Sequence, residues 1–210
     1  MNKIRISDIT VVKIKNGKFK KEIPEFYKLK KVIENNGWHN KETVFGHTIV
    51  VLKELDRYIK KISPKIKRYL NQKLDGYARK DLLFLSTIFH DIAKKETLIT
   101  VKGGTSCPSH EEASSKKVVN ILNRFDLTAK EKKIVAEIIK NHGAIHFILF
   151  PGNKSFNSEY KRFKLKNYKI YLELMILAAA DTDRSYLKKT NLAEFNFRMN
   201  FYKKVFNQYL

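Results

Sequence analysis

The sequence is poor in the features that place a protein in an oxidising compartment or in a membrane. It has one cysteine, Cys107, so it cannot form an internal disulfide, which is typical of a protein from a reducing compartment. It has no run of about 18 apolar residues that would predict a transmembrane helix, and its first residues lack the apolar stretch of a signal peptide. We therefore expect a soluble, cytoplasmic protein without a membrane partner.

Acidic residues are also scarce, at 21 Asp and Glu against 43 Lys and Arg, which gives a formal net charge of +22. Such a charge attracts nucleotides, RNA and other polyanions. However, 35 of the basic residues are lysines and 8 are arginines, and arginine, the better residue for bidentate phosphate binding, is not clustered. The charge thus allows two interpretations: a phosphorylated small molecule, nucleotide or RNA as partner, or a solvated lysine-rich surface set by codon bias.

The length and composition predict one folded domain with a small N-terminal extension. With 210 residues, of which 43% are hydrophobic and 12% aromatic, the chain can bury a substantial core. In residues 1–36, the alternation of apolar and lysine residues around Asn16-Gly17 predicts a β-hairpin, and residues 24–36 predict a short helix. From residue 37 to 210 the apolar residues recur with a helical period, which predicts an all-α domain.

Six longer helices are expected in this domain. Their predicted ranges are 43–61, 79–94, 110–125, 128–141, 168–180 and 191–208. Between them we expect a long loop over residues 95–107 and another over residues 143–165. Loops of such length are often functional, and the aromatic residues of the second suggest a lid that covers a substrate.

The helix predicted over residues 79–94 carries the first candidate for chemistry. It is apolar on nearly every side, as a helix in the middle of a domain is, yet His90 and Asp91 stand together near its end. A buried carboxylate is costly unless it is paired, hydrogen-bonded or bound to a metal ion. A divalent cation would satisfy both side chains. The alternative is an aspartate at a helix end beside a histidine held by a backbone carbonyl.

Four further candidates lie on other helices. His47 is on the apolar face of its helix, and His110 is in a first helical turn, where the helix dipole does not favour a histidine. His142 ends a helix, and Asp181 follows three alanines that permit close helix packing, so its carboxylate needs a counter-charge. Each of the histidines also has a structural explanation, as a core or surface residue.

The order of these residues is more specific than any one of them. The series His47, His90-Asp91, His110, His142 and Asp181 resembles the HD superfamily of metal-dependent phosphohydrolases, over roughly residues 39–187. The local context is most similar to the HD part of bacterial tRNA nucleotidyltransferases, although no nucleotidyltransferase domain accompanies it here. The resemblance implies an HD-domain helical bundle, to which the predicted N-terminal hairpin would be appended.

The resemblance also assigns roles to the candidates. It implies that His47, His90, Asp91 and Asp181 bind one divalent metal ion, and that His110 and His142 bind a second ion or contact the phosphate. Imidazole and carboxylate ligands suit Mn, Fe, Co, Ni or Zn better than Mg. Lys94, close after His90, could stabilise the developing charge on a phosphoryl group, or it could be a solvated lysine at a helix end.

Departures from known members narrow the expected substrate. Lys94-Lys95 stands where stringent-response hydrolases have a Glu-Asp pair, and the Gly-Tyr-Pro element of cyclic-di-GMP phosphodiesterases is missing. We therefore expect a phosphomonoesterase or phosphodiesterase that acts on nucleotides or nucleic-acid phosphates. Two alternatives remain open: a non-catalytic nucleotide- or RNA-binding module on the same scaffold, and an adaptor in which the metal ion only holds helices together.

Overall fold

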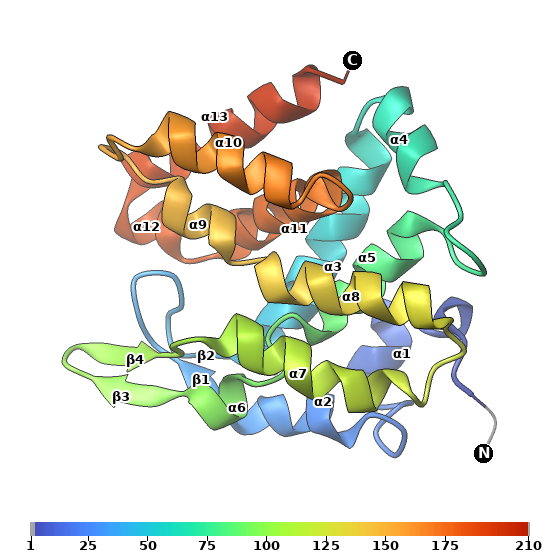
Figure 1. The fold of residues 1–210 in the computed structure, drawn as a ribbon. Helices are drawn as coiled ribbons and strands as arrows, with labels where there is room; N and C mark the ends of the chain where they lie inside the picture. The colour runs from blue at the N-terminus through green and yellow to red at the C-terminus, as the bar shows by residue number, and fades with distance from the viewer. Residues whose placement is uncertain (1–2, 210) are drawn as a thin grey trace.

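The computed structural model describes residues 3–209 and confirms the all-α class (Figure 1). The longer helices are α3 (Val44–Lys61), α5 (Arg79–Phe89), α7 (His110–Leu122), α8 (Ala129–Asn141), α10 (Phe156–Lys166), α11 (Tyr171–Arg184) and α13 (Leu192–Asn207). The shorter ones are α1 (Val11–Lys15), α2 (Pro24–Lys28), α4 (Pro64–Leu70), α6 (Lys94–Thr97), α9 (Ala144–Ile148) and α12 (Leu187–Thr190), with 3-10 turns η1 (Ile6–Asp8) and η2 (Leu29–Lys31). Strands β1 (Ile33–Glu34) and β2 (Glu42–Thr43) form one small antiparallel pair, and β3 (Ile99–Val101) and β4 (Gly104–Ser106) form another.

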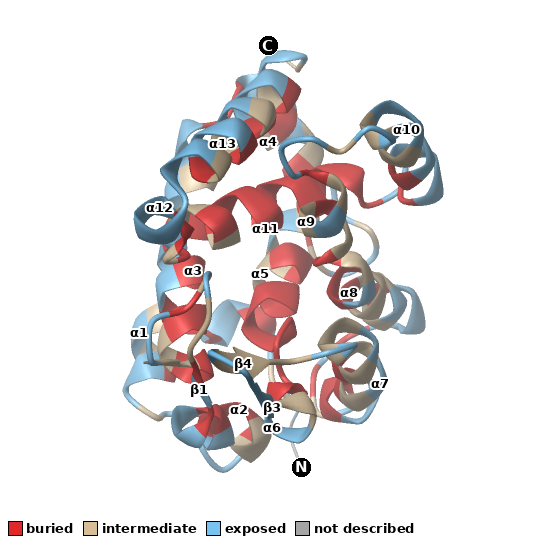
Figure 2. Cartoon of the chain, turned by 90° about the vertical axis from the view of Figure 1, so that its left-hand side faces the viewer, coloured by how far each residue is buried: buried red, intermediate tan, exposed pale blue. Residues whose placement is uncertain are grey.

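Helix α5 lies at the centre of the bundle, as the sequence predicts. It packs against α3, α8 and α11, and Figure 2 shows that α5 and α11 are largely buried. Most of its apolar side chains belong to one hydrophobic cluster, while Leu83 belongs to the second cluster, around α11. At its last residue, the Phe89 ring packs edge-on against Phe26 and Phe125. The residue that follows, His90, is therefore held at a fixed point of the core.

The β-hairpin predicted around Asn16-Gly17 is not found at that position. Residues Val11–Lys15 form helix α1, whose first turn is capped by the Thr10 hydroxyl accepting from the Lys13 backbone N–H. A strand would place Val12 and Ile14 on one face, whereas Ile14 is fully buried and Val12 is 67% exposed. The cap and the burial of Ile14 outweigh the alternating pattern.

The helix predicted over residues 24–36 is also shorter than expected. It ends at Lys31 as α2 and η2, and β1 then pairs with β2, bringing Ile33 opposite Thr43. Apolar side chains from residues 6–32 share the hydrophobic cluster of α3 and α5. The division into an extension of residues 1–36 and a domain of residues 37–210 stays a prediction.

Neither of the two long loops is present as predicted. Residues 94–106 form α6 and the β3–β4 hairpin, and residues 144–166 contain α9 and α10. The lid hypothesis fails for Phe156 and Tyr160, because both rings pack against Phe201 of α13. No helix within residues 3–209 is long and apolar enough to cross a membrane.

The β3–β4 hairpin is attached to the loop after β1 at Gly104. The Thr105 backbone N–H donates to the Asn35 carbonyl at 2.8 Å, and a Cβ on Gly104 would lie 2.0 Å from that same oxygen. We expect Gly104→Ala to lower the free energy of unfolding by about 1–3 kcal/mol, the usual cost of overpacking. Urea unfolding measures this, with Gly37→Ala as a control because nothing lies within 4 Å of the Cβ position there. Equal midpoints for the two variants would contradict the close contact.

Candidate metal centre

The predicted site residues come together from six separate elements. His47 lies on α3, His90 and Asp91 directly follow α5, and Asp181 lies in the last turns of α11. His110 is the first residue of α7, His142 directly follows α8, and Lys94 begins α6. All of these helices direct one end or inner face at the same point, although the segments are up to 134 residues apart in the sequence.

Two triads of metal-ligand atoms share His90. The ligand atoms of His47, His90 and Asp181 lie within 4.8 Å of one another, and so do those of His90, Asp91 and His142. Five side chains thus surround two adjoining positions, and four of them are the ligands expected for one ion. Imidazole nitrogens with carboxylate oxygens are a donor set that holds divalent transition metals.

Three histidines are oriented by the same backbone contact. The Nδ1–H groups of His90, His110 and His142 point at the carbonyl oxygens three residues earlier, at 2.8, 2.9 and 2.7 Å. A histidine that donates from Nδ1 keeps a free lone pair on Nε2 when it is neutral, and this is the arrangement found in metal-binding histidines. The alternative considered from the sequence, a histidine held by a backbone carbonyl, is therefore true of His90, but it prepares the ring to bind a cation.

The three Nε2 atoms converge on Asp91. They lie 3.2, 3.2 and 3.7 Å from its carboxylate oxygens for His90, His110 and His142. The Nε2 of His90 and the Oδ1 of Asp91 are buried and have no hydrogen-bond partner among residues 3–209. Burial would raise the pKa of the Asp91 carboxyl, but His90, Lys94 and the other histidines hold it well below its ordinary value. The charge of this carboxylate is balanced by protons on the facing imidazole rings or by a cation bound between them, and its oxygens with the three Nε2 atoms are a donor set that fits a divalent metal ion.

The His47 side of the centre contains two partly buried carboxylates, of Asp181 and Glu42. His47 Nε2 lies 2.7 Å from Asp181 Oδ1, and its Nδ1 lies 3.4 Å from Glu42 Oε1. Burial lowers the pKa of His47, but the hydrogen bonds to Asp181 and Glu42 outweigh burial and raise it to about 10. The positive charge that the two carboxylates require comes from a proton on His47 or from a bound cation. Glu42 also accepts from His39 Nδ1 at 2.7 Å, which places it behind His47 as an orienting group.

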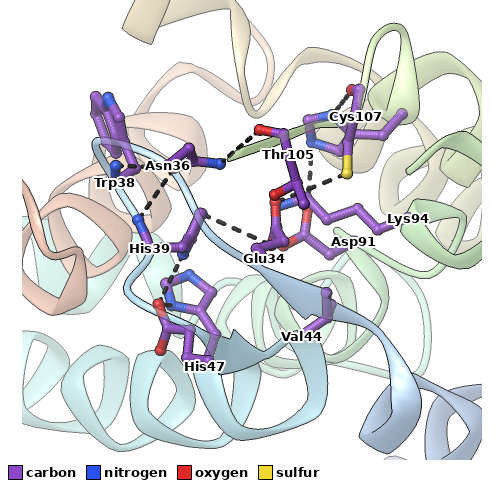
Figure 3. A network of polar contacts seen from close by, with 12 residues as sticks. Glu34, Asn36, Trp38, His39, Val44, His47, Asp91, Lys94, Thr105 and Cys107 are labelled. Atoms are coloured by element: carbon purple, nitrogen blue, oxygen red, sulfur yellow. Dashed lines mark hydrogen bonds and ion pairs between the residues drawn. The ribbon is translucent and has the colours of Figure 1, made fainter. Parts of the chain in front are cut away.

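Lys94 joins this centre to the strand β1. Its Nζ lies 3.0 Å from Asp91 Oδ2 and 2.9 Å from Glu34 Oε2, and all three side chains are buried. Figure 3 shows how Glu34, His39 and His47 continue this network across the site. Burial lowers the pKa of Lys94, but the two carboxylates outweigh it and raise the pKa above the ordinary value. The view of Lys94 as a solvated helix-end lysine is therefore wrong, while its role toward a phosphoryl group stays a prediction.

Sequence reasoning missed a further histidine of the centre. His146, on α9, is partly buried and its Nε2 lies 3.3 Å from Asp181 Oδ2. It follows His142 by four residues, the spacing that places two side chains on one side of a helical segment, and this spacing could have revealed it. Glu34, Glu42 and Glu111 also surround the centre, but no pattern in the sequence marks them.

A cavity of about 600 Å³ opens onto these residues. Among its lining residues, Asp91, Lys94 and His142 are buried, and His110, His146 and Asp181 are partly exposed. This volume is in the range of pockets that bind small molecules. Its charged lining is mostly acidic or imidazole, and its Lys94 and Arg198 are both held in buried ion pairs. The large positive charge of the chain is therefore not concentrated in the cavity wall.

A model of the HD domain family matches residues 44–183. This range covers α3 to α11 and contains each of the histidine and aspartate residues predicted to bind metal. The chain belongs to the HD domain family, which confirms the predicted superfamily and the HD-type helical bundle.

Similar proteins of known name are larger enzymes. The bifunctional uridylyltransferase/uridylyl-removing enzyme of Acinetobacter baumannii strain ACICU is 27% identical over 138 residues, which is 66% of this chain and 14% of that enzyme. The enzyme of the same name from Acinetobacter baylyi strain ATCC 33305 gives the same values. The chain thus spans only a small part of the length of these relatives. The finer likeness to tRNA nucleotidyltransferases stays a prediction.

Proposed function

We propose that the protein is a divalent-metal-dependent phosphohydrolase that acts on phosphate esters of nucleotides or nucleic acids. The observation that carries this proposal is the convergence of three oriented Nε2 atoms on the Asp91 carboxylate at the base of a cavity. The names of the relatives support it, because removal of a uridylyl group is a reaction at the phosphorus of a nucleotide. Cytoplasmic location and a phosphorylated partner belong to the same proposal.

Different residues of the site would bind the metal ion, contact the phosphate and stabilise its developing charge. His47, His90, Asp91 and Asp181 would hold a divalent ion, with Mn, Fe, Co, Ni or Zn favoured over Mg by the imidazole ligands. When bound, such an ion lowers the pKa of a coordinated water and polarises a phosphoryl oxygen. His110 and His142 would hold a second ion or contact the phosphate through their free Nε2 atoms. Lys94, kept charged by Glu34 and Asp91, would donate to a phosphoryl oxygen as negative charge develops there.

The binding module remains the second candidate. It is favoured by the burial of Lys94 in two ion pairs. These bonds hold its Nζ on the carboxylates of Glu34 and Asp91, so that it is less free to donate to a phosphoryl oxygen. In that case the same cavity would bind nucleotides without turnover. The two functions differ in phosphate release, not in metal content.

The deciding measurement combines metal analysis with turnover. We expect the purified protein to contain a transition metal and to release nitrophenol from p-nitrophenyl or bis-p-nitrophenyl phosphate with added Mn, Co or Ni. His90→Ala should lose both properties, while its helical circular dichroism stays unchanged, because the substitution removes the hydrogen bond of the ring to the Thr87 carbonyl at the end of α5 but keeps the backbone hydrogen bonds of the helix. A protein that binds metal but hydrolyses neither ester, nor any nucleotide, would favour the binding module. A protein that binds no metal after reconstitution would exclude both metal-dependent functions.

A further inference from the structure

The more exposed part of the cavity lining differs in chemistry from the buried residues of the metal centre. It includes Trp38, Phe147 and Phe150 beside the backbone turn at Asn36. Phe147 is 74% exposed and Phe150 is 43% exposed, and within residues 3–209 neither ring packs against another aromatic ring. Exposed aromatic side chains at the mouth of a polar cavity indicate a ligand that carries a flat, apolar ring.

Trp38 is held in place more firmly than a surface side chain. Its backbone N–H donates to the Asn36 side chain at 2.8 Å, and its carbonyl accepts from the Tyr186 N–H. The Arg198 guanidinium lies 4.8 Å from the indole centre, and the His146 ring packs edge-on at 5.0 Å. Arg198 is itself buried and donates to the His146 carbonyl and to Glu194. The indole is therefore a preorganised wall of the cavity.

Trp38, Phe147 and Phe150 together are called the aromatic wall below, and this wall adjoins the metal centre directly. The same His146 ring that contacts Trp38 has its Nε2 3.3 Å from Asp181 Oδ2, and Phe147 is the next residue. One imidazole thus separates the aromatic wall from a predicted metal ligand, much as one sugar separates the base from the phosphate in a nucleotide.

We propose that Trp38, Phe147 and Phe150 form a nucleobase-binding subsite, so that a nucleotide binds with its base between these rings and its phosphate at the metal centre. This inference rests on the proposed function, because it uses the metal centre as the phosphate end. Stacking is tolerant of base identity, and the Asn36 amide is occupied by bonds to Trp38, His39 and Thr105. We therefore expect uridine and adenosine nucleotides to bind alike.

The test uses Trp38 as its own reporter, because it is the only tryptophan of the chain. In the metal-reconstituted protein, uridine or adenosine 5′-monophosphate should quench its fluorescence at much lower concentration than ribose 5-phosphate, which lacks the base. Phe147→Ala should weaken nucleotide binding by about 5- to 150-fold, the effect of losing one stacking partner, and should leave ribose 5-phosphate unchanged. Phe197→Ala is the matched control: this ring is 42% exposed on α13, away from the cavity lining.

Each outcome bears on the subsite separately from the enzyme activity. Equal binding of the mononucleotides and ribose 5-phosphate, unaffected by Phe147→Ala, would overturn the subsite even if p-nitrophenyl esters are hydrolysed. Base-dependent quenching without hydrolysis of any ester would support the subsite and refute the phosphohydrolase. The base could belong to an RNA end or to a free nucleotide, and a 5′-phosphorylated oligoribonucleotide separates these two ligands. Tighter binding than the mononucleotide points to an RNA end, and weaker binding points to a free nucleotide. Base-dependent binding supports the subsite in both cases.

Discussion

Asp91→Asn is expected to remove metal-dependent phosphate release and most of the bound metal. The Asp91 carboxylate faces His90, His110 and His142 together, and an amide would place a neutral group among their Nε2 atoms. Loss of even an outer partner of a metal ligand costs about 10–100-fold in affinity or activity, so loss of this carboxylate should exceed about 100-fold. Elemental analysis and phosphate release from the same preparation measure the two effects.

The control for this variant is Asp56→Asn. Asp56 is an exposed residue of α3 that pairs with the exposed Lys60, so its loss should change neither metal content nor turnover. The helical circular dichroism of both variants should match that of the parent protein. Full activity of Asp91→Asn would show that the metal centre as described is not the site of the reaction.

Lys94→Met should produce the largest loss of stability. It leaves the Glu34 carboxylate buried without its closest cation, and breaking a buried ion pair from one side costs about 3–5 kcal/mol. Removing the charge of Glu34 as well should recover part of this loss, because Glu34→Gln removes one of the two buried carboxylates that pair with Lys94. We therefore expect Lys94→Met/Glu34→Gln to be more stable than Lys94→Met alone. Urea unfolding of the metal-free proteins measures the free energies.

The neighbouring Lys95 provides the matched control. Its side chain is exposed at the start of α6, so Lys95→Met should change the free energy of unfolding by no more than about 0.5 kcal/mol. A double variant less stable than Lys94→Met would contradict the view that Glu34 is the uncompensated charge. A similar loss in Lys94→Met and Lys95→Met would contradict the buried network altogether.

The parts of the fold with strong local signals could be predicted from the sequence. The helix predicted over residues 128–141 is present as α8, which begins with a capping box: the Thr128 hydroxyl accepts from the Glu131 N–H, and the Glu131 carboxylate accepts from the Thr128 N–H. The apolar period of residues 43–61 likewise gives α3 within one residue of its observed bounds. Where the pattern was short, tertiary packing decided, as for Ile14 in α1.

The residues of the candidate site also fall into those that could be predicted from the sequence and those that could not. Its histidines and aspartates could be recognised because they sit at the ends or inner faces of strongly periodic helices. The carboxylates that orient them could not, because Glu34 and Glu42 reach the site only through the pairing of β1 with β2. Two-residue strands leave too few residues for any alternation to be detected. Phe147 and Phe150 lie in the stretch that was predicted to be a lid. Trp38, which also lines the cavity, could not be linked to them, because it comes from a loop more than 100 residues earlier in the chain.

The hydrogen bonds from the rings of His90, His110 and His142 to backbone carbonyls affect which substitutions the site can tolerate during evolution. The acceptors belong to Thr87, Cys107 and Ile139, and in each case the backbone carbonyl, not the side chain, accepts the hydrogen bond. Any residue that keeps the local backbone can supply the same acceptor, so substitutions at these three positions leave the rings oriented. A centre built in this way can persist while the surrounding sequence drifts, which is consistent with the match of only 27% identity to the uridylyl-removing enzymes.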